Sequence, residues 1–98
     1  MTRIELAPEV LDDFDRFFDH IARHDPGSAP ERIQAIIDAL QILSHSPRIG
    51  RPVQGGKREL VIGDSAARGY VALYHYVQDM DTVFVLAVCS QREAGFKH

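Results

Sequence analysis

The stretches Tyr70–Val77 (YVALYHYV) and Thr82–Ser90 (TVFVLAVCS) decide the fold of this chain. Both are rich in β-branched and aromatic residues, which favour strands. The residues between them, 78–81 (QDMD), are polar and few enough to form a tight turn. The pattern predicts an antiparallel hairpin against which the rest of the chain packs.

The residues that begin the chain predict a strand followed by a helix. Residues 3–6 (RIEL) alternate polar and apolar side chains, as a strand with one buried face does. Pro8 suits the first turn of a helix, and acidic residues follow it near the positive end of the helix dipole. An apolar stripe then recurs at three- and four-residue steps, made of Val10, Leu11, Phe14, Phe17, Phe18 and Ile21.

A second helix follows a Pro-Gly break at residues 26–27. Ser28 and Glu31 have the spacing of a capping box, which predicts the start of this helix. The helix ends near Ser46, because the residue before Pro47 is disfavoured in the helical region. So short a connection predicts an antiparallel pair of helices.

A basic loop and one more strand complete the predicted fold. Residues 47–57 (PRIGRPVQGGK) are rich in proline and glycine, Arg58–Ile62 (RELVI) is a strand, and residues 63–69 form a polar turn. The order β-α-α-β-β-β predicts an α+β fold, an antiparallel sheet with a two-helix hairpin packed on one face. At 98 residues, we expect a single domain spanning residues 1–98.

Charge and cysteine content narrow the class of protein. The net charge is −3, but residues 47–68 hold five basic and two acidic side chains, which suits an acidic partner. The single cysteine, Cys89, fits a reducing cytoplasm. Residues 1–10 show neither a secretory signal nor a membrane span, so we expect a soluble cytoplasmic protein.

No motif for a cofactor or metal ion stands out. Gly50, Gly55 and Gly56 fit neither nucleotide-binding glycine pattern, so no cofactor is expected. His20 and His24 lie four residues apart on one helix face, but without an intervening glutamate the pattern is weak. We interpret both as surface histidines and expect no metal site.

Strand parity separates two faces of residues 70–77. The three tyrosines and Ala72 share the face expected to pack on the helices, while His75 lies on the other face with Val71, Leu73 and Val77. A histidine beside arginines suits acid-base chemistry on a phosphodiester, but it equally suits a docking surface. Both interpretations of His75 remain open on the residues alone.

Several short motifs, in order, resemble the RelE/ParE superfamily, the toxins of bacterial type II toxin-antitoxin pairs. The resemblance rests on the two-helix start and on residues 46–52 (SPRIGRP), 58–60 (REL), 69–70 (GY), 73–74 (LY), 85–88 (VLAV) and 91–96 (QREAGF). It covers nearly the whole chain and implies two helices packed on an antiparallel sheet. It also implies plasmid stabilisation or growth arrest as the biological setting.

The superfamily has two activities, and departures from the nuclease pattern favour one of them. RelE-like members cut mRNA on the ribosome with strand arginines, loop lysines and a C-terminal tyrosine, whereas ParE-like members poison DNA gyrase. Here Val71 stands where the nucleases have arginine, and Phe96 stands where they have tyrosine. Lys57 is the one lysine near the loop, and Arg92 matches the nuclease pattern.

The resemblance therefore predicts a gyrase poison without catalytic residues, neutralised by a cognate antitoxin in a hetero-oligomer. One alternative is a RelE-type endoribonuclease acting on ribosome-bound mRNA; another is a non-toxic co-repressor that only binds its antitoxin. The candidate catalytic residues of a nuclease would be Arg58, His75, Arg92 and His98. The candidate antitoxin- or target-binding residues are Arg48, Arg51, Lys57, Arg58, Val71, Leu73, His75, Arg92 and Phe96.

The strand residues also predict an apolar surface that the two helices do not cover. Val71, Leu73, Val83, Phe84 and Val85 offer more apolar surface than two helices can cover. Uncovered apolar patches usually mark interfaces. We expect an acidic, amphipathic segment of the antitoxin to lie across these strands and across the basic loop.

Overall fold

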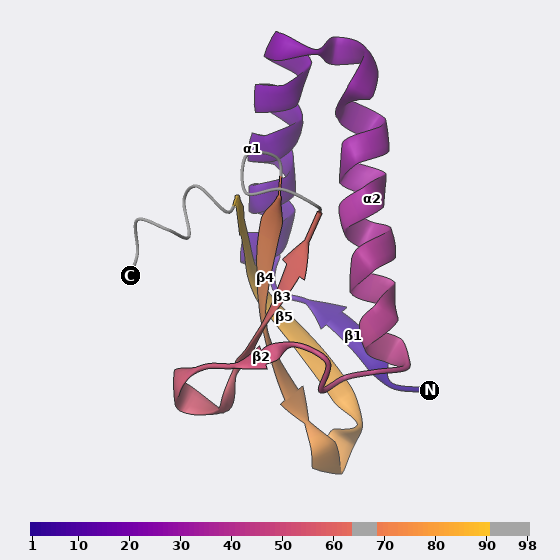
Figure 1. The fold of residues 1–98 in the computed structure, drawn as a ribbon, viewed down its shortest axis with the longest axis vertical. Helices are drawn as coiled ribbons and strands as arrows, with labels where there is room; N and C mark the ends of the chain where they lie inside the picture. The colour runs from indigo at the N-terminus through magenta and orange to yellow at the C-terminus, as the bar shows by residue number, and fades with distance from the viewer. Residues whose placement is uncertain (64–68, 91–98) are drawn as a thin grey trace.

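The computed structural model describes residues 1–63 and 69–90. The predicted order of the main elements is confirmed, and Figure 1 shows the two helices side by side, connected at their upper ends. The elements with their bounds are β1 (Arg3–Leu6), α1 (Pro8–His24), α2 (Ala29–Gln41), β2 (Arg51–Pro52), β3 (Arg58–Ile62), β4 (Tyr70–Val77) and β5 (Thr82–Ser90). Short 3-10 turns occur at Pro26–Ser28, Ile42–Ser44, Gln54–Gly56 and Gln78–Met80.

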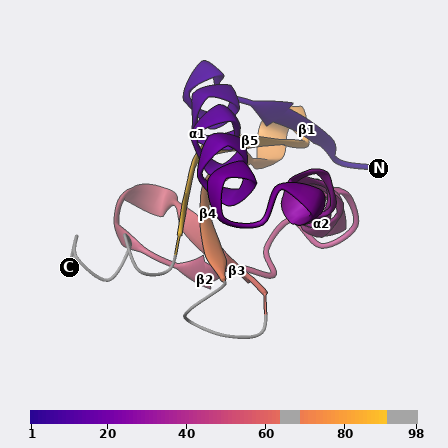
Figure 2. The ribbon, with the colours of Figure 1, turned by 90° about the horizontal axis from the view of Figure 1, so that it is seen from above.

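The sheet has five strands in the order β1-β5-β4-β3-β2. All neighbouring pairs are antiparallel except β1 and β5, which run parallel with Ile4 opposite Val83. The two-residue strand β2 lies within the segment predicted as a loop. Seen from above, both helices lie against the same sheet (Figure 2). The α+β prediction is therefore confirmed, with β2 as an added edge.

A β-bulge in β5 changes which residues face the helices. Leu73 pairs with Ala87 but Tyr74 pairs with Val85, so Leu86 is the extra residue. Val85 before the bulge and Val88 after it both face the helices although they are three residues apart, and both are fully buried.

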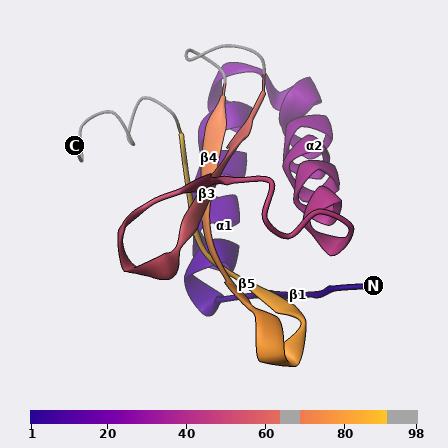
Figure 3. The same cartoon turned by 60° about the horizontal axis from the view of Figure 1, so that its bottom comes forward.

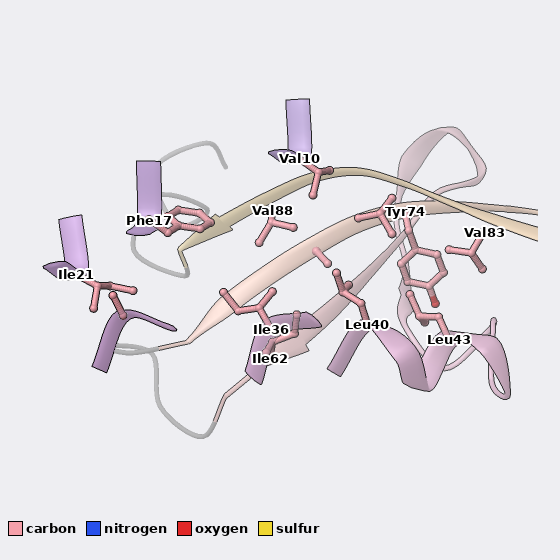
Figure 4. Close-up of a cluster of buried hydrophobic side chains, with 13 residues drawn as sticks. Val10, Phe17, Ile21, Ile36, Leu40, Leu43, Ile62, Tyr74, Val83 and Val88 are labelled. Atoms are coloured by element: carbon pink, nitrogen blue, oxygen red, sulfur yellow. The ribbon is translucent and has the colours of Figure 1, made fainter. Parts of the chain in front are cut away.

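The core lies between the helical hairpin and one face of the sheet. Figure 4 shows Phe17 of α1 and Leu40 of α2 facing side chains of the strands, among them Val88 and Tyr74. The three tyrosines of β4 pack on this core as predicted, and Tyr74 is 0% exposed.

Three sequence interpretations were wrong at the level of packing. Val83 and Val85 are buried under the helices, so they do not belong to the uncovered strand surface. Leu11 and Phe18 face solvent although they belong to the apolar stripe of α1. Ser28 donates its hydroxyl hydrogen to the carbonyl of Asp25 at 3.1 Å and does not cap α2.

Candidate functional site

The sheet face turned away from the helices, here called the open face, is lined by half-buried side chains. On β4 these include Val71, Leu73 and His75, as strand parity predicted. Their antiparallel neighbours on β5 lie directly opposite, with Leu73 beside Ala87 and His75 beside Phe84. The face therefore offers apolar surface that neither α1 nor α2 covers.

A hollow of about 410 Å³ lies at the β1 side of the open face. Phe84 and Leu86 of β5 line it together with Leu6 of β1 and Met80 of the turn. Sequence reasoning missed this hollow, because it depends on the parallel pairing of β1 with β5 and on the bulge at Leu86.

The chain from residue 47 to residue 58, here called the basic segment, is held to the sheet at Gly50. The Gly50 N–H donates to the Tyr74 hydroxyl oxygen at 2.9 Å. The Arg58 guanidinium donates to the carbonyls of Gly50 at 2.8 Å and Arg48 at 3.1 Å. Figure 3 shows this segment leaving the end of α2, reaching the strands and turning back into β3. Arg58 thus fixes the segment instead of pointing into the open face.

The two other arginines of the basic segment also make intramolecular contacts. Arg48 donates to the side-chain oxygen of Gln78 at 2.8 Å, and its guanidinium carbon lies 4.9 Å from the centre of the Tyr76 ring. Arg51 forms an ion pair with Glu59 across β2 and β3 at 2.5 Å, with 73% of its side chain exposed. Both arginines are exposed, so each keeps donors available to a partner.

His75 supports the glycine turn of the basic segment. Gly55 and Gly56 have positive φ angles of 80° and 74°, which glycine adopts without the steric cost of a side chain. The His75 Nδ1 lies 3.0 Å from the Gly56 carbonyl oxygen. A carbonyl only accepts, so Nδ1 carries the hydrogen and neutral His75 keeps Nε2 as an acceptor. Lys57 follows the turn and is half-buried.

A separate polar cluster fixes the β4–β5 turn to the start of the chain. The Asp81 carboxylate accepts hydrogen bonds from the hydroxyls of Thr2 at 2.7 Å and Tyr76 at 2.8 Å. These bonds, Thr2 first, hold the pKa of Asp81 below its ordinary value of 3.8. The hydrogen bond to Asp81 in turn raises the pKa of Tyr76 above its ordinary value of 10.0. The cluster is structural, and it positions the Tyr76 ring beneath Arg48.

The residues proposed for a nuclease are only partly brought together. Arg58 pairs with Tyr74 in the sheet and lies on the helix side, whereas His75 is the next residue of β4 and points to the open face. Arg92 and His98 lie outside the described residues, as does Phe96 of the binding set. Within the described chain, therefore, the two nuclease candidates do not converge on one site.

The histidine pair of α1 makes a ring contact. The ring centres of His20 and His24 are 4.8 Å apart, and both side chains are exposed. Within residues 1–63 and 69–90, no three metal-binding side chains gather into one group. In the same ranges, no helix has the length and apolar content needed to span a bilayer.

Comparison with solved structures shows the same fold in both toxin branches. The chromosomal ParDE system of P. aeruginosa matches with a TM-score of 0.77 at 19% identity, covering 92% of this chain and 96% of that one. The E. coli RelBE complex matches with a TM-score of 0.62 at 16% identity, covering 92% and 96%. The isolated E. coli RelE toxin matches with a TM-score of 0.60 at 14% identity, covering 99% and 98%.

A family model distinguishes the branches where the fold does not. No curated protein matches the chain. The model described as the ParE toxin of the type II toxin-antitoxin system parDE matches residues 4–95, nearly the full length. The chain therefore belongs to the ParE toxin family of type II toxin-antitoxin systems.

Proposed function

We propose that this toxin arrests growth by binding DNA gyrase and trapping its cleaved DNA complex, without catalysis of its own. The observation that carries the proposal is the match to the ParE family over residues 4–95. The intramolecular contacts of three arginines support the absence of catalysis, because Arg48, Arg51 and Arg58 are each bonded to another group of the chain. A nuclease site needs cations directed at the phosphate that reacts.

The RelE-type alternative finds less support in the described residues. Val71 is a half-buried apolar side chain at the strand position that follows Gly69-Tyr70. His75 has one ring nitrogen engaged by the Gly56 carbonyl, and Arg58 is directed at carbonyls on the other side of the sheet. Such an arrangement suits a protein-binding platform better than a set of groups converging on RNA.

Two assays run side by side test the proposal. Purified toxin is added to gyrase with supercoiled DNA, and separately to ribosomes programmed with mRNA. We expect cleaved DNA complexes to accumulate in the first assay and mRNA to remain intact in the second. Ribosome-dependent mRNA cleavage that His75→Ala abolishes, with no gyrase effect, would overturn the proposal in favour of the nuclease. Normal growth on expression without antitoxin would favour the co-repressor.

The proposed antitoxin contact is an acidic, amphipathic segment lying over the open face and the basic segment. The similar ParDE structure is of a chromosomal toxin-antitoxin system and the RelBE structure is of a toxin-antitoxin complex, and this toxin has the same fold. Arg48 and Arg51 are exposed and carry the positive charge of this surface. Such a segment would use apolar side chains against Leu73 and Phe84 and carboxylates against the arginines.

Charge reversal tests this contact. Arg48→Glu with Arg51→Glu should weaken binding of the cognate antitoxin more at low salt than at high salt, because exposed charges are screened. Arg23→Glu, at the exposed end of α1, makes the same kind of change away from the surface and should leave binding unaltered. Equal losses at both salt concentrations would remove the basic segment from the interface.

A further inference from the structure

Two histidines near the C-terminal end of α1 have no part in the proposed function. His20 and His24 lie four residues apart, so their side chains leave one face of the helix about 6 Å apart along its axis. Their ring centres are 4.8 Å apart, with an angle of 62° between the ring planes. The spacing alone is a weak signal, but the ring contact shows that the two imidazoles lie together in the folded protein.

Both rings are accessible to a ligand from solvent. The two side chains are exposed, and within residues 1–63 and 69–90 neither ring forms a hydrogen bond or ion pair with another side chain or carbonyl. A neutral imidazole with an available nitrogen is the commonest protein ligand of transition metals. His20 and His24 therefore offer two ring nitrogens to one ion.

The surface beside His20 leaves room for the other ligands of such an ion. A hollow of about 230 Å³ lies there, bordered by His20 together with Tyr70 of β4 and Ser90 of β5. A water molecule occupies about 30 Å³ in the liquid, so the hollow has space for several. An ion held by the two rings would keep bound water on this side.

The charges near the pair do not prevent a cation from binding. Arg16 lies one turn before the pair, and its guanidinium is paired with Asp13 at 3.2 Å. Arg23 follows Asp19 by four residues, the spacing at which opposite charges interact along a helix. His24 is the last residue of α1, where the negative end of the helix dipole favours a cation.

We propose that His20 and His24 together bind one divalent transition-metal ion through a nitrogen of each ring. Imidazole suits Zn²⁺, Cu²⁺ and Ni²⁺, whereas Mg²⁺ and Ca²⁺ prefer oxygen ligands. Among the described residues no third metal-binding side chain joins the pair, so the remaining positions of the ion belong to water or to a ligand from outside the chain. The site lies on the helical layer and goes beyond gyrase binding at the open face.

Zinc binding to the full chain tests the proposal. Zn²⁺ is titrated into the toxin at neutral pH and followed by calorimetry, and we expect saturable binding. His24→Gln should raise Kd about tenfold or more, because the second ring of a pair binds at a high effective concentration. The matched control is His45→Gln, which removes an exposed histidine outside the pair and should change Kd less than about twofold.

A second pair of variants separates chelation from a general affinity of histidines for zinc. Asp19→His with His20→Gln keeps two histidines but places them five residues apart, about 140° around the helix, where one ion cannot reach both rings. It should bind zinc no more tightly than Asp19→Asn with His20→Gln. Binding by either His24→Gln or the respaced variant with the Kd of the parent protein would overturn the proposal.

Thermal unfolding gives an independent measurement of the same site. An ion that binds the folded pair more tightly than the unfolded chain stabilises the fold. Zinc should therefore raise the melting temperature of the parent protein and of His45→Gln, but not that of His24→Gln. An equal rise in His24→Gln would place the bound zinc elsewhere and would also overturn the proposal.

Discussion

Gly50 is the position where one methyl group should have the largest effect on the basic segment. The Cβ of an alanine there would lie 2.6 Å from the Tyr74 hydroxyl oxygen and 2.8 Å from both Tyr74 Cε1 and the Glu59 carbonyl oxygen. Gly50 is buried and lacks the positive φ of Gly55, so the obstacle is space and not backbone conformation. The alanine must therefore push the segment off the sheet.

The cost of Gly50→Ala is the balance of three contributions. Overpacking a buried site costs about 1–3 kcal/mol. Stretching the Gly50 N–H bond to Tyr74 adds about 0.5–1.5 kcal/mol. The alanine also lowers the conformational entropy of the unfolded chain, which stabilises the folded protein by about 0.4–1 kcal/mol. We expect a net loss of about 0.5–4 kcal/mol in the free energy of unfolding, against a typical total of about 5–15 kcal/mol.

Urea denaturation followed by circular dichroism measures this loss as a lower midpoint at an unchanged slope. Gly27→Ala is the matched control, because no heavy atom lies within 4 Å of the added Cβ, and it should cause no loss but a gain of about 0.4–1 kcal/mol from the more restricted unfolded chain. Adding Tyr74→Phe should not restore stability, since the Glu59 carbonyl still blocks the methyl group. A midpoint for Gly50→Ala equal to that of the parent protein would refute the close packing described here.

Substitutions at three other positions test further contacts. Arg58→Lys removes the guanidinium that donates to two backbone carbonyls and should lower the free energy of unfolding in urea by about 1–2 kcal/mol. An unchanged free energy of unfolding would mean that these two hydrogen bonds are dispensable. The hydrogen bond from Thr2 lowers the pKa of Asp81, so its carboxylate contributes stability above pH 3.8 that is lost as pH falls through the lowered value. Asp81→Asn should therefore melt earlier at pH 7, with the difference closing in acid; a constant difference would contradict this. Asp13 accepts the Val88 N–H at 3.0 Å, so Asp13→Ala should cost about 1–3 kcal/mol and speed exchange of that amide, while Asp13→Asn should cost less.

The sequence predicted the elements well because their periodicities are local. Pro8, the Pro-Gly break and Pro47 mark the helices, and the apolar runs mark the long strands. The parity of β4 was also readable, since its three tyrosines share one face with Ala72. Local patterns of this kind predict structure because apolar residues that recur on one face of a helix or strand are the ones buried in the core.

Features set by long-range pairing were not readable. The strand TVFVLAVCS is apolar on both faces, so nothing local says that Val83 and Val85 are the buried ones. Their burial follows from the register with β4 and from the bulge at Leu86, which reverses the parity. The capping-box prediction at Ser28 was wrong because Ser28 has αR backbone angles, φ −102° and ψ −7°, instead of the extended backbone of a capping serine, and its side chain turns back to the Asp25 carbonyl.

The role of Arg58 shows the same limit at the candidate site. In sequence it is one of several cations in a basic segment, which suggests recognition of an acidic partner. In the fold its donors satisfy the carbonyls of Arg48 and Gly50, a task that arises only once the segment has closed onto β3. Composition can therefore locate a basic segment without showing which of its charges remain available.

The distribution of those available charges bears on the kind of partner. RNA bound over the open face and the basic segment would have to compete with Glu59 for Arg51 and with Gln78 and the Tyr76 ring for Arg48. Each contact displaced reduces the net gain from a phosphate. A protein partner avoids this competition, because it can bury Leu73 and its apolar neighbours while using only the donors that the arginines still expose. The geometry of the arginines thus supports the proposal of a protein ligand for the open face.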